Sequence, residues 1–134
     1  MPASELARMD VKAQRRILIV DNEESIQAAL TWLLKSAGYE TLATWSGIAA
    51  LELLQLSKFD VLLVNDYLAD LHVDEFLKRV SLLPIPPRVV VMQAGTAKTI
   101  KRDFCQYTQL PSCSTADKTH MERVIQAIGA ALEK

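Results

Sequence analysis

Three short runs of consecutive apolar residues constrain the fold of this chain more than any other feature of its sequence. These runs cover residues 17–20, 61–64 and 89–92, and each consists of Val, Ile, Leu or Met side chains. A strand that is hydrophobic on both faces must be covered on both sides, which is the situation in a parallel sheet. The runs therefore predict buried parallel strands that are joined by helical crossovers.

Segments with helical periodicity alternate with these runs along the chain. Gly38 is a typical residue after a helix end, Ser46 is a typical N-cap, and Thr119 with Glu122 matches a capping box. The expected helices cover residues 26–37, 46–56, 73–80, 96–107 and 121–132, and the expected strands cover residues 17–20, 39–45, 59–64, 89–92 and 110–113. This alternation predicts right-handed β-α-β crossovers and a three-layer α/β sandwich around a five-stranded parallel sheet.

The composition limits the size and the partners of the protein. The chain has 134 residues, which is the size of one domain. Residues 1–14 lack clean periodicity and are expected to be a flexible lead-in to a domain over residues 15–134. A net charge of −1 argues against nucleic acid or an anionic membrane as the main partner. No apolar run approaches the roughly 20 residues that span a bilayer.

Cysteine and histidine are too few and too scattered to suggest a metal site. The chain has two of each, and the cysteines do not form a C-x-x-C motif. This pattern argues against a zinc site or a disulfide framework and favours reduced thiols in a cytoplasmic protein.

An aspartate lies at or just beyond the end of two of the expected strands. Asp21 follows the first expected strand, and Asp66 closely follows the third. Ligands of open parallel sheets bind beyond the carboxyl ends of the strands, so the two carboxylates lie side by side if these strands are neighbours. Two carboxylates held this close repel, so one takes up a proton unless a cation lies between them, and oxygen ligands without His or Cys suit Mg²⁺. A metal-bound aspartate can act as a nucleophile towards a phosphoryl donor. The alternative is a purely structural role for both residues, in which Asp21 caps a helix and Asp66 starts a turn.

Two segments resemble the response-regulator receiver domain of two-component signalling. They are residues 17–26, ILIVDNEESI, and residues 59–66, FDVLLVND, and the resemblance extends over about residues 15–132. It implies the flavodoxin-like strand order 2-1-3-4-5 and Asp66 as the phosphoacceptor. It also implies that Mg²⁺ is bound by Asp21, Asn22, Asp66 and the backbone carbonyl of Leu68.

The same resemblance implies the partners and the chemistry of the protein. The phosphodonor would be a sensor histidine kinase or a phosphotransfer protein, and the signal would pass to an output domain or a partner protein. Direct binding of nucleic acid is not expected, and a homodimer is a further option. The protein would not be an enzyme, beyond Mg²⁺-dependent self-phosphorylation and dephosphorylation of Asp66.

Several positions depart from the family pattern. The family usually has a second carboxylate where this chain has Asn22, whose uncharged amide should bind Mg²⁺ more weakly. Gln93 replaces the Thr or Ser that contacts the phosphoryl group. Lys118 is the nearest candidate for the family lysine, and Tyr107 is the candidate for the aromatic switch position. Residues 67–74 supply neither the proline nor the glycine that the family has after the phosphoacceptor.

These departures leave a second function open, a phosphorylation-independent pseudo-receiver that acts as a protein-interaction module. Lys98, Lys101 and Arg102 in the expected fourth helix are either a solvated face or part of a docking patch. A flavin or nucleotide carrier on the same fold is disfavoured, because the strand ends offer carboxylates rather than glycine-rich loops that cradle phosphate. The predicted function is phosphorelay through Asp66, with phosphorylation-independent docking as the alternative.

Overall fold

The computed structural model describes residues 15–93, 107–111 and 118–133. Its strands are β1 (Arg16–Val20), β2 (Glu40–Thr44), β3 (Val61–Asn65), β4 (Arg88–Gln93) and β5 (Tyr107–Pro111). Its helices are α2 (Glu24–Ser36), α3 (Gly47–Leu56), α4 (Val73–Ser81) and α5 (Lys118–Glu133). The strands pair in parallel in the order β2-β1-β3-β4, with β5 beside β4. The predicted α/β fold and the order of the first four strands are therefore confirmed.

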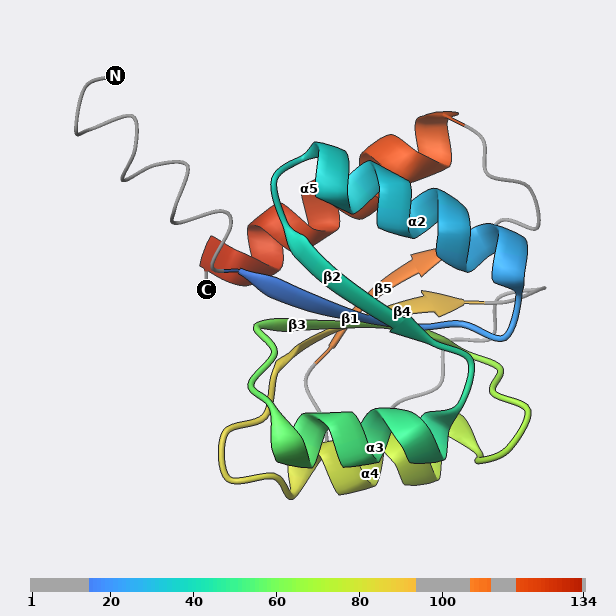
Figure 1. Cartoon of the computed structure of the whole chain (residues 1–134), viewed down its shortest axis with the longest axis vertical. Helices are drawn as coiled ribbons and strands as arrows, with labels where there is room; N and C mark the ends of the chain where they lie inside the picture. Colours follow the sequence, from blue (N-terminus) through green and yellow to red (C-terminus); the bar gives the residue numbers. More distant parts are fainter. Residues whose placement is uncertain (1–14, 94–106, 112–117, 134) are drawn as a thin grey trace.

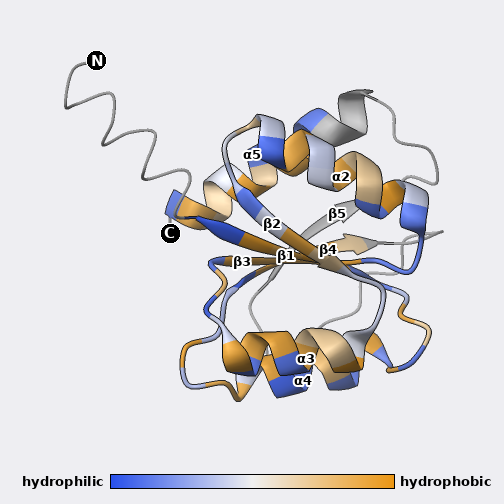
Figure 2. Cartoon of the chain, viewed as in Figure 1, coloured by the Kyte–Doolittle hydropathy of each residue, from blue (hydrophilic) through white to orange (hydrophobic). Residues whose placement is uncertain are grey.

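The helices form a layer on each face of the sheet. Helices α2 and α5 cover one face, and α3 and α4 cover the other (Figure 1). Ile17 and Ile19 of β1 belong to the core on the side of α2 and α5, while Leu18 and Val20 belong to the core on the side of α3 and α4. All five residues of β3 are buried. Burial on both faces explains why these strands are apolar at successive positions (Figure 2).

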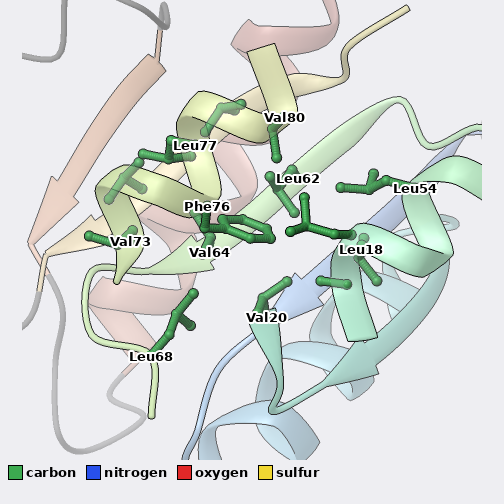
Figure 3. Packing of buried hydrophobic residues seen from close by; sticks show 14 of the residues in the cluster. Leu18, Val20, Leu54, Leu62, Val64, Leu68, Val73, Phe76, Leu77 and Val80 are labelled. Atoms are coloured by element: carbon green, nitrogen blue, oxygen red, sulfur yellow. The ribbon is translucent and has the colours of Figure 1, made fainter. Parts of the chain in front are cut away.

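Phe76 is the largest fully buried side chain of the described residues. It projects from α4 towards the sheet, where Figure 3 shows its ring close to Leu62 and Val64 of β3. Leu18 and Leu77 belong to the same core cluster. This aromatic ring thus fills the space between α4 and the central strands.

The end of α2 agrees with the prediction at Gly38. This residue has a positive φ of 96°. Its N–H donates to the Lys35 carbonyl and the Tyr39 N–H donates to the Leu34 carbonyl, each over 3.0 Å. These two bonds form a Schellman motif, which satisfies carbonyl groups that the helix leaves unpaired.

Replacing Gly38 by alanine is expected to lower the free energy of unfolding by about 1–2 kcal/mol, because an L side chain is strained at positive φ. Gly129→Ala is the matched control, because a Cβ added at this position of α5 meets no atom within 4 Å. This control should raise the free energy of unfolding by about 0.5–1 kcal/mol, since alanine favours a helix. Urea denaturation measures both changes, and effects of the same sign would contradict the account.

Two predictions near the C-terminus are wrong in detail. The fifth strand begins at Tyr107, three residues before the predicted start and at the residue where the predicted helix over 96–107 ends. Tyr107 is aromatic and Thr108 is β-branched, and both residue types favour a strand. Helix α5 begins at Lys118, so Thr119 lies inside the helix and does not form the N-cap of a capping box. The rest of the predicted helix over 96–107 and the predicted lead-in over 1–14 lie outside the described residues.

None of the helices within the described ranges is long and apolar enough to cross a membrane.

Candidate functional site

The candidate site lies at the carboxyl edge of the central strands. Strands β1 and β3 are parallel neighbours, and Val20 pairs with Val64. Asp21 directly follows β1, and Asp66 directly follows β3. The fold therefore brings these two predicted site residues to the same edge of the sheet, on adjacent strands.

The carboxylate of Asp21 is fully buried and held by two hydrogen bonds. Its Oδ2 atom accepts from Asn65 Nδ2 over 3.1 Å, and its Oδ1 atom accepts from the Glu23 backbone N–H over 2.9 Å. The Asp21 backbone is fixed as well, because its N–H donates to the Thr44 carbonyl and its own carbonyl accepts from the Gln27 side-chain amide. Asp21 is not the N-cap of α2, since Glu23 occupies that position.

Asn65 is part of this site, although no role was predicted for it from the sequence. Its side chain is 8% exposed, and it contacts Asp21 on one side. Its Oδ1 atom accepts from the Tyr67 backbone N–H over 2.9 Å. Asn65 therefore connects the end of β1 with the start of the loop after β3. The available sequence signal was a polar side chain at the end of an otherwise apolar strand.

Asp66 continues the ladder between β3 and β4. Its backbone N–H donates to the Met92 carbonyl over 2.8 Å, and the residue is half-buried. Leu68, two residues later, is 6% exposed and packs with Val73 and Phe76 in the core beneath α3 and α4. The start of the loop after β3 is thus fixed at two points, by the backbone of Asp66 on the sheet and by the side chain of Leu68 in the core.

The other predicted site residues occupy different places. Asn22 is exposed in the turn between β1 and α2. Gln93 is the last residue of β4 and pairs with Pro111, so its backbone lies at the carboxyl edge. Tyr107 pairs with Val89 at the opposite end of β5, and Lys118 is the first residue of α5. Lys98, Lys101 and Arg102 lie outside the described residues.

Asp70 makes a second set of contacts in the loop between β3 and α4. Its Oδ2 atom accepts from Ser46 Oγ over 2.6 Å and from the Ile48 N–H over 3.2 Å, and its Oδ1 atom accepts from the Gly47 N–H over 2.9 Å. Burial raises the pKa of Asp70, but the hydrogen bonds from Ser46, Gly47 and Ile48 outweigh it, so the pKa is lowered overall. We call these three contacts the Asp70 clamp.

The donor atoms at this edge are compatible with Mg²⁺. Both side chains that follow β1 and β3 are carboxylates. Each Asp21 carboxylate oxygen accepts one hydrogen bond from the protein, which leaves it further acceptor capacity. Within residues 15–93, 107–111 and 118–133, no group of three or more His, Cys, Asp or Glu side chains could hold a metal ion. Mg²⁺ needs no such group, because it is commonly held by one or two carboxylates and keeps several waters.

The sequence matches known proteins over most of its length. The model of the response regulator receiver domain matches residues 17–110. A curated relative, the sporulation initiation phosphotransferase F of Bacillus subtilis (strain 168), is 29% identical over 79 residues. That alignment covers 59% of this chain and 64% of the relative, so the match spans less than two thirds of the relative's length.

Solved structures resemble the fold. Chemotaxis response regulator CheY4 of Vibrio cholerae is 21% identical, with a TM-score of 0.73 over 84% of this chain and 96% of that one. A putative response regulator from Chloroflexus aurantiacus J-10-fl is also 21% identical, with a TM-score of 0.76 over 90% of this chain and 98% of that one. These structures show that the fold is shared. The family model, which matches more than half of the chain, shows that the chain belongs to the response regulator receiver domain family, whose members are non-enzymatic modules of two-component signalling.

Proposed function

We propose that this receiver domain relays a signal by accepting a phosphoryl group on Asp66, with Mg²⁺ held by Asp21, Asn22, Asp66 and the backbone carbonyl of Leu68. The observation that carries the proposal is the position of two acids directly after adjacent parallel strands, one of them a buried carboxylate. The proposal includes a receiver domain over residues 15–134 with a five-stranded sheet, working in the cytoplasm.

Asp66 would supply the nucleophile for the transfer. One of its carboxylate oxygens forms a bond to phosphorus, and the P–N bond of a phosphohistidine breaks. The electron pair of that bond returns to the imidazole, which takes a proton from solvent, and Asp66 becomes an acyl phosphate. Mg²⁺, when bound, neutralises negative charge on the transferring phosphoryl group.

The neighbouring residues would determine how strongly the cation is held. Asp21 contributes a negative charge whose position is fixed by Asn65 and the Glu23 N–H. Asn22 contributes at most a neutral amide oxygen, so the site carries one negative charge fewer than a site with an acid there. We therefore expect weaker Mg²⁺ binding than in an Asn22→Asp variant. Gln93, Tyr107 and Lys118 remain predicted switch or phosphate-contact positions.

The partners follow from the proposed chemistry. Membership of the receiver family supports a sensor histidine kinase or a phosphotransfer protein as the phosphodonor, and an output domain or partner protein as the recipient of the signal. The name of the curated relative, a phosphotransferase of sporulation initiation, is consistent with a role in phosphoryl transfer. A homodimer stays a prediction.

The proposal is tested by phosphorylation with a small acyl phosphate in the presence of Mg²⁺. We expect a mass gain of one phosphoryl group, located on the peptide that contains Asp66, and we expect Asp66→Asn to abolish it. Asp74→Asn, in the first turn of α4, is the matched control and should keep the adduct. A folded wild-type protein that forms no adduct, or forms it elsewhere, would overturn the proposal.

One observation favours the alternative of a phosphorylation-independent interaction module. The protein itself supplies hydrogen bonds to both oxygens of Asp21, so this buried carboxylate is accommodated by protein groups. Partner binding that is unchanged in Asp66→Ala, and unchanged when Mg²⁺ is removed, would support this alternative. Loss of binding in a folded Asp66→Ala protein would count against it.

A further inference from the structure

The loop between β3 and α4 packs directly on the first residue of α3. A Cβ atom added at Gly47 would lie 3.1 Å from Leu68 Cδ1 and 3.4 Å from Leu71 Cβ. Such close spacing means that the loop and the start of α3 touch without room for a side chain between them. Any constraint on this contact therefore acts on Leu68, whose backbone carbonyl belongs to the proposed Mg²⁺ site.

The Asp70 clamp is one constraint on this contact. It joins one loop carboxylate to three consecutive residues at the start of α3, namely Ser46, Gly47 and Ile48. The amides of Gly47 and Ile48 belong to the first turn of the helix, where N–H groups lack partners within the helix. The Ser46 hydroxyl also accepts from the Ala49 N–H over 3.0 Å, so the N-cap and the clamp form one network.

The clamp is one of several attachments along the loop. Before Leu68, the Tyr67 N–H donates to Asn65 Oδ1. At Leu68, the side chain is buried in the core. After Asp70, the His72 side chain accepts from the Asp74 N–H over 3.2 Å and caps α4. Residues 67–74 contain no proline to restrict the backbone, so the constraint comes from these contacts.

We propose that Asp70 is a positioning residue, whose clamp on the start of α3 holds the backbone carbonyl of Leu68 in place for Mg²⁺. This inference rests on the proposed function and extends it to a residue that lies outside the cation's own ligands. Asp70 does not touch the cation; it acts through the loop that carries Leu68. Loss of the clamp should therefore weaken Mg²⁺ binding while the fold persists.

The test measures the dissociation constant of Mg²⁺ by calorimetry in the full chain. Asp70→Ala removes all three acceptor contacts, and we expect the constant to rise about tenfold, as for lost outer-shell partners of a metal site. Asp70→Asn should give a smaller rise, because its amide oxygen can still accept from the Gly47 N–H while its amide nitrogen cannot accept from Ile48. Amide hydrogen exchange over residues 67–71 should accelerate in the same order.

Two control variants separate positioning from general effects. Glu52→Gln removes one negative charge from an exposed position on α3 and should leave the dissociation constant within about twofold, because a charge in solvent is screened. Gly38→Ala destabilises the protein at the end of α2 and should also leave the constant unchanged. A constant that rises equally in Gly38→Ala and Asp70→Ala would overturn the positioning role.

The remaining outcomes distinguish this inference from the proposed function. If the folded wild-type protein binds no Mg²⁺, the proposed function fails and this inference fails with it. If the wild type binds Mg²⁺ and folded Asp70→Ala and Asp70→Asn bind it equally well, only this inference is overturned. Weaker binding in both variants, with faster exchange in the loop and unchanged controls, supports it.

Discussion

Asp21→Ala is expected to weaken Mg²⁺ binding by more than about a hundredfold and to prevent phosphorylation of Asp66. The substitution removes the buried carboxylate that the structure holds at the end of β1. Losing a direct ligand should exceed the roughly 10–100-fold effect of losing an outer-shell partner. Calorimetric titration with Mg²⁺ measures the first effect, and mass spectrometry after treatment with an acyl phosphate measures the second.

Asn22→Asp is the opposing control for this prediction. It places a carboxylate next to Asp21, and the added negative charge should tighten Mg²⁺ binding. Circular dichroism should show that Asp21→Ala remains folded, although Asn65 loses a partner at a cost of about 1–3 kcal/mol. Unchanged Mg²⁺ affinity in a folded Asp21→Ala protein would remove Asp21 from the site.

Phe76→Ala should have the largest effect on stability, lowering the free energy of unfolding by about 3–5 kcal/mol. Its ring is fully buried between α4 and the central strands, so truncation leaves a cavity in the core on that face of the sheet (Figure 3). Urea denaturation at equilibrium measures the change. Such a loss is a large fraction of the roughly 5–15 kcal/mol by which folded proteins are typically stable.

An exposed residue close to the end of the same helix provides the control for this core substitution. Leu82 caps the C-terminus of α4 and is 76% exposed, so Leu82→Ala should change the free energy of unfolding by no more than about 0.5 kcal/mol. A loss below about 1 kcal/mol in Phe76→Ala would contradict the packing described for this face.

The central strands were predictable because burial on both faces selects apolar residues at every position. The predicted strand over 59–64 begins two residues before β3 and ends one residue before it, and the predicted strand over 89–92 lies within β4. Strand β5 was predicted less well, because it is the outermost strand on the β4 side of the sheet and contains the polar residues Thr108 and Gln109. An edge strand is under weaker selection for a continuous apolar run, so periodicity located it only approximately.

The positions of Asp21 and Asp66 at one edge followed from topology, since residues after adjacent parallel strands share that edge. The contacts that organise this edge could not be predicted in the same way. Asn65 meets Asp21 across 44 residues of sequence, and Asp70 meets Ser46 across 24. No local pattern encodes these pairings, because they depend on how the loop after β3 packs against α3.

The most direct test of the account is a Mg²⁺ titration followed by two-dimensional NMR of the backbone amides, completed by addition of an acyl phosphate. Mg²⁺ should shift the amides of residues 21–23 and 65–68, and the phosphodonor should produce a second set of changes centred on Asp66. Amides at the opposite edge, around Lys58 and Asp60, should stay in place. Shifts confined to that opposite edge, or no response to Mg²⁺ at Asp21 and Asp66, would contradict the assignment of this site.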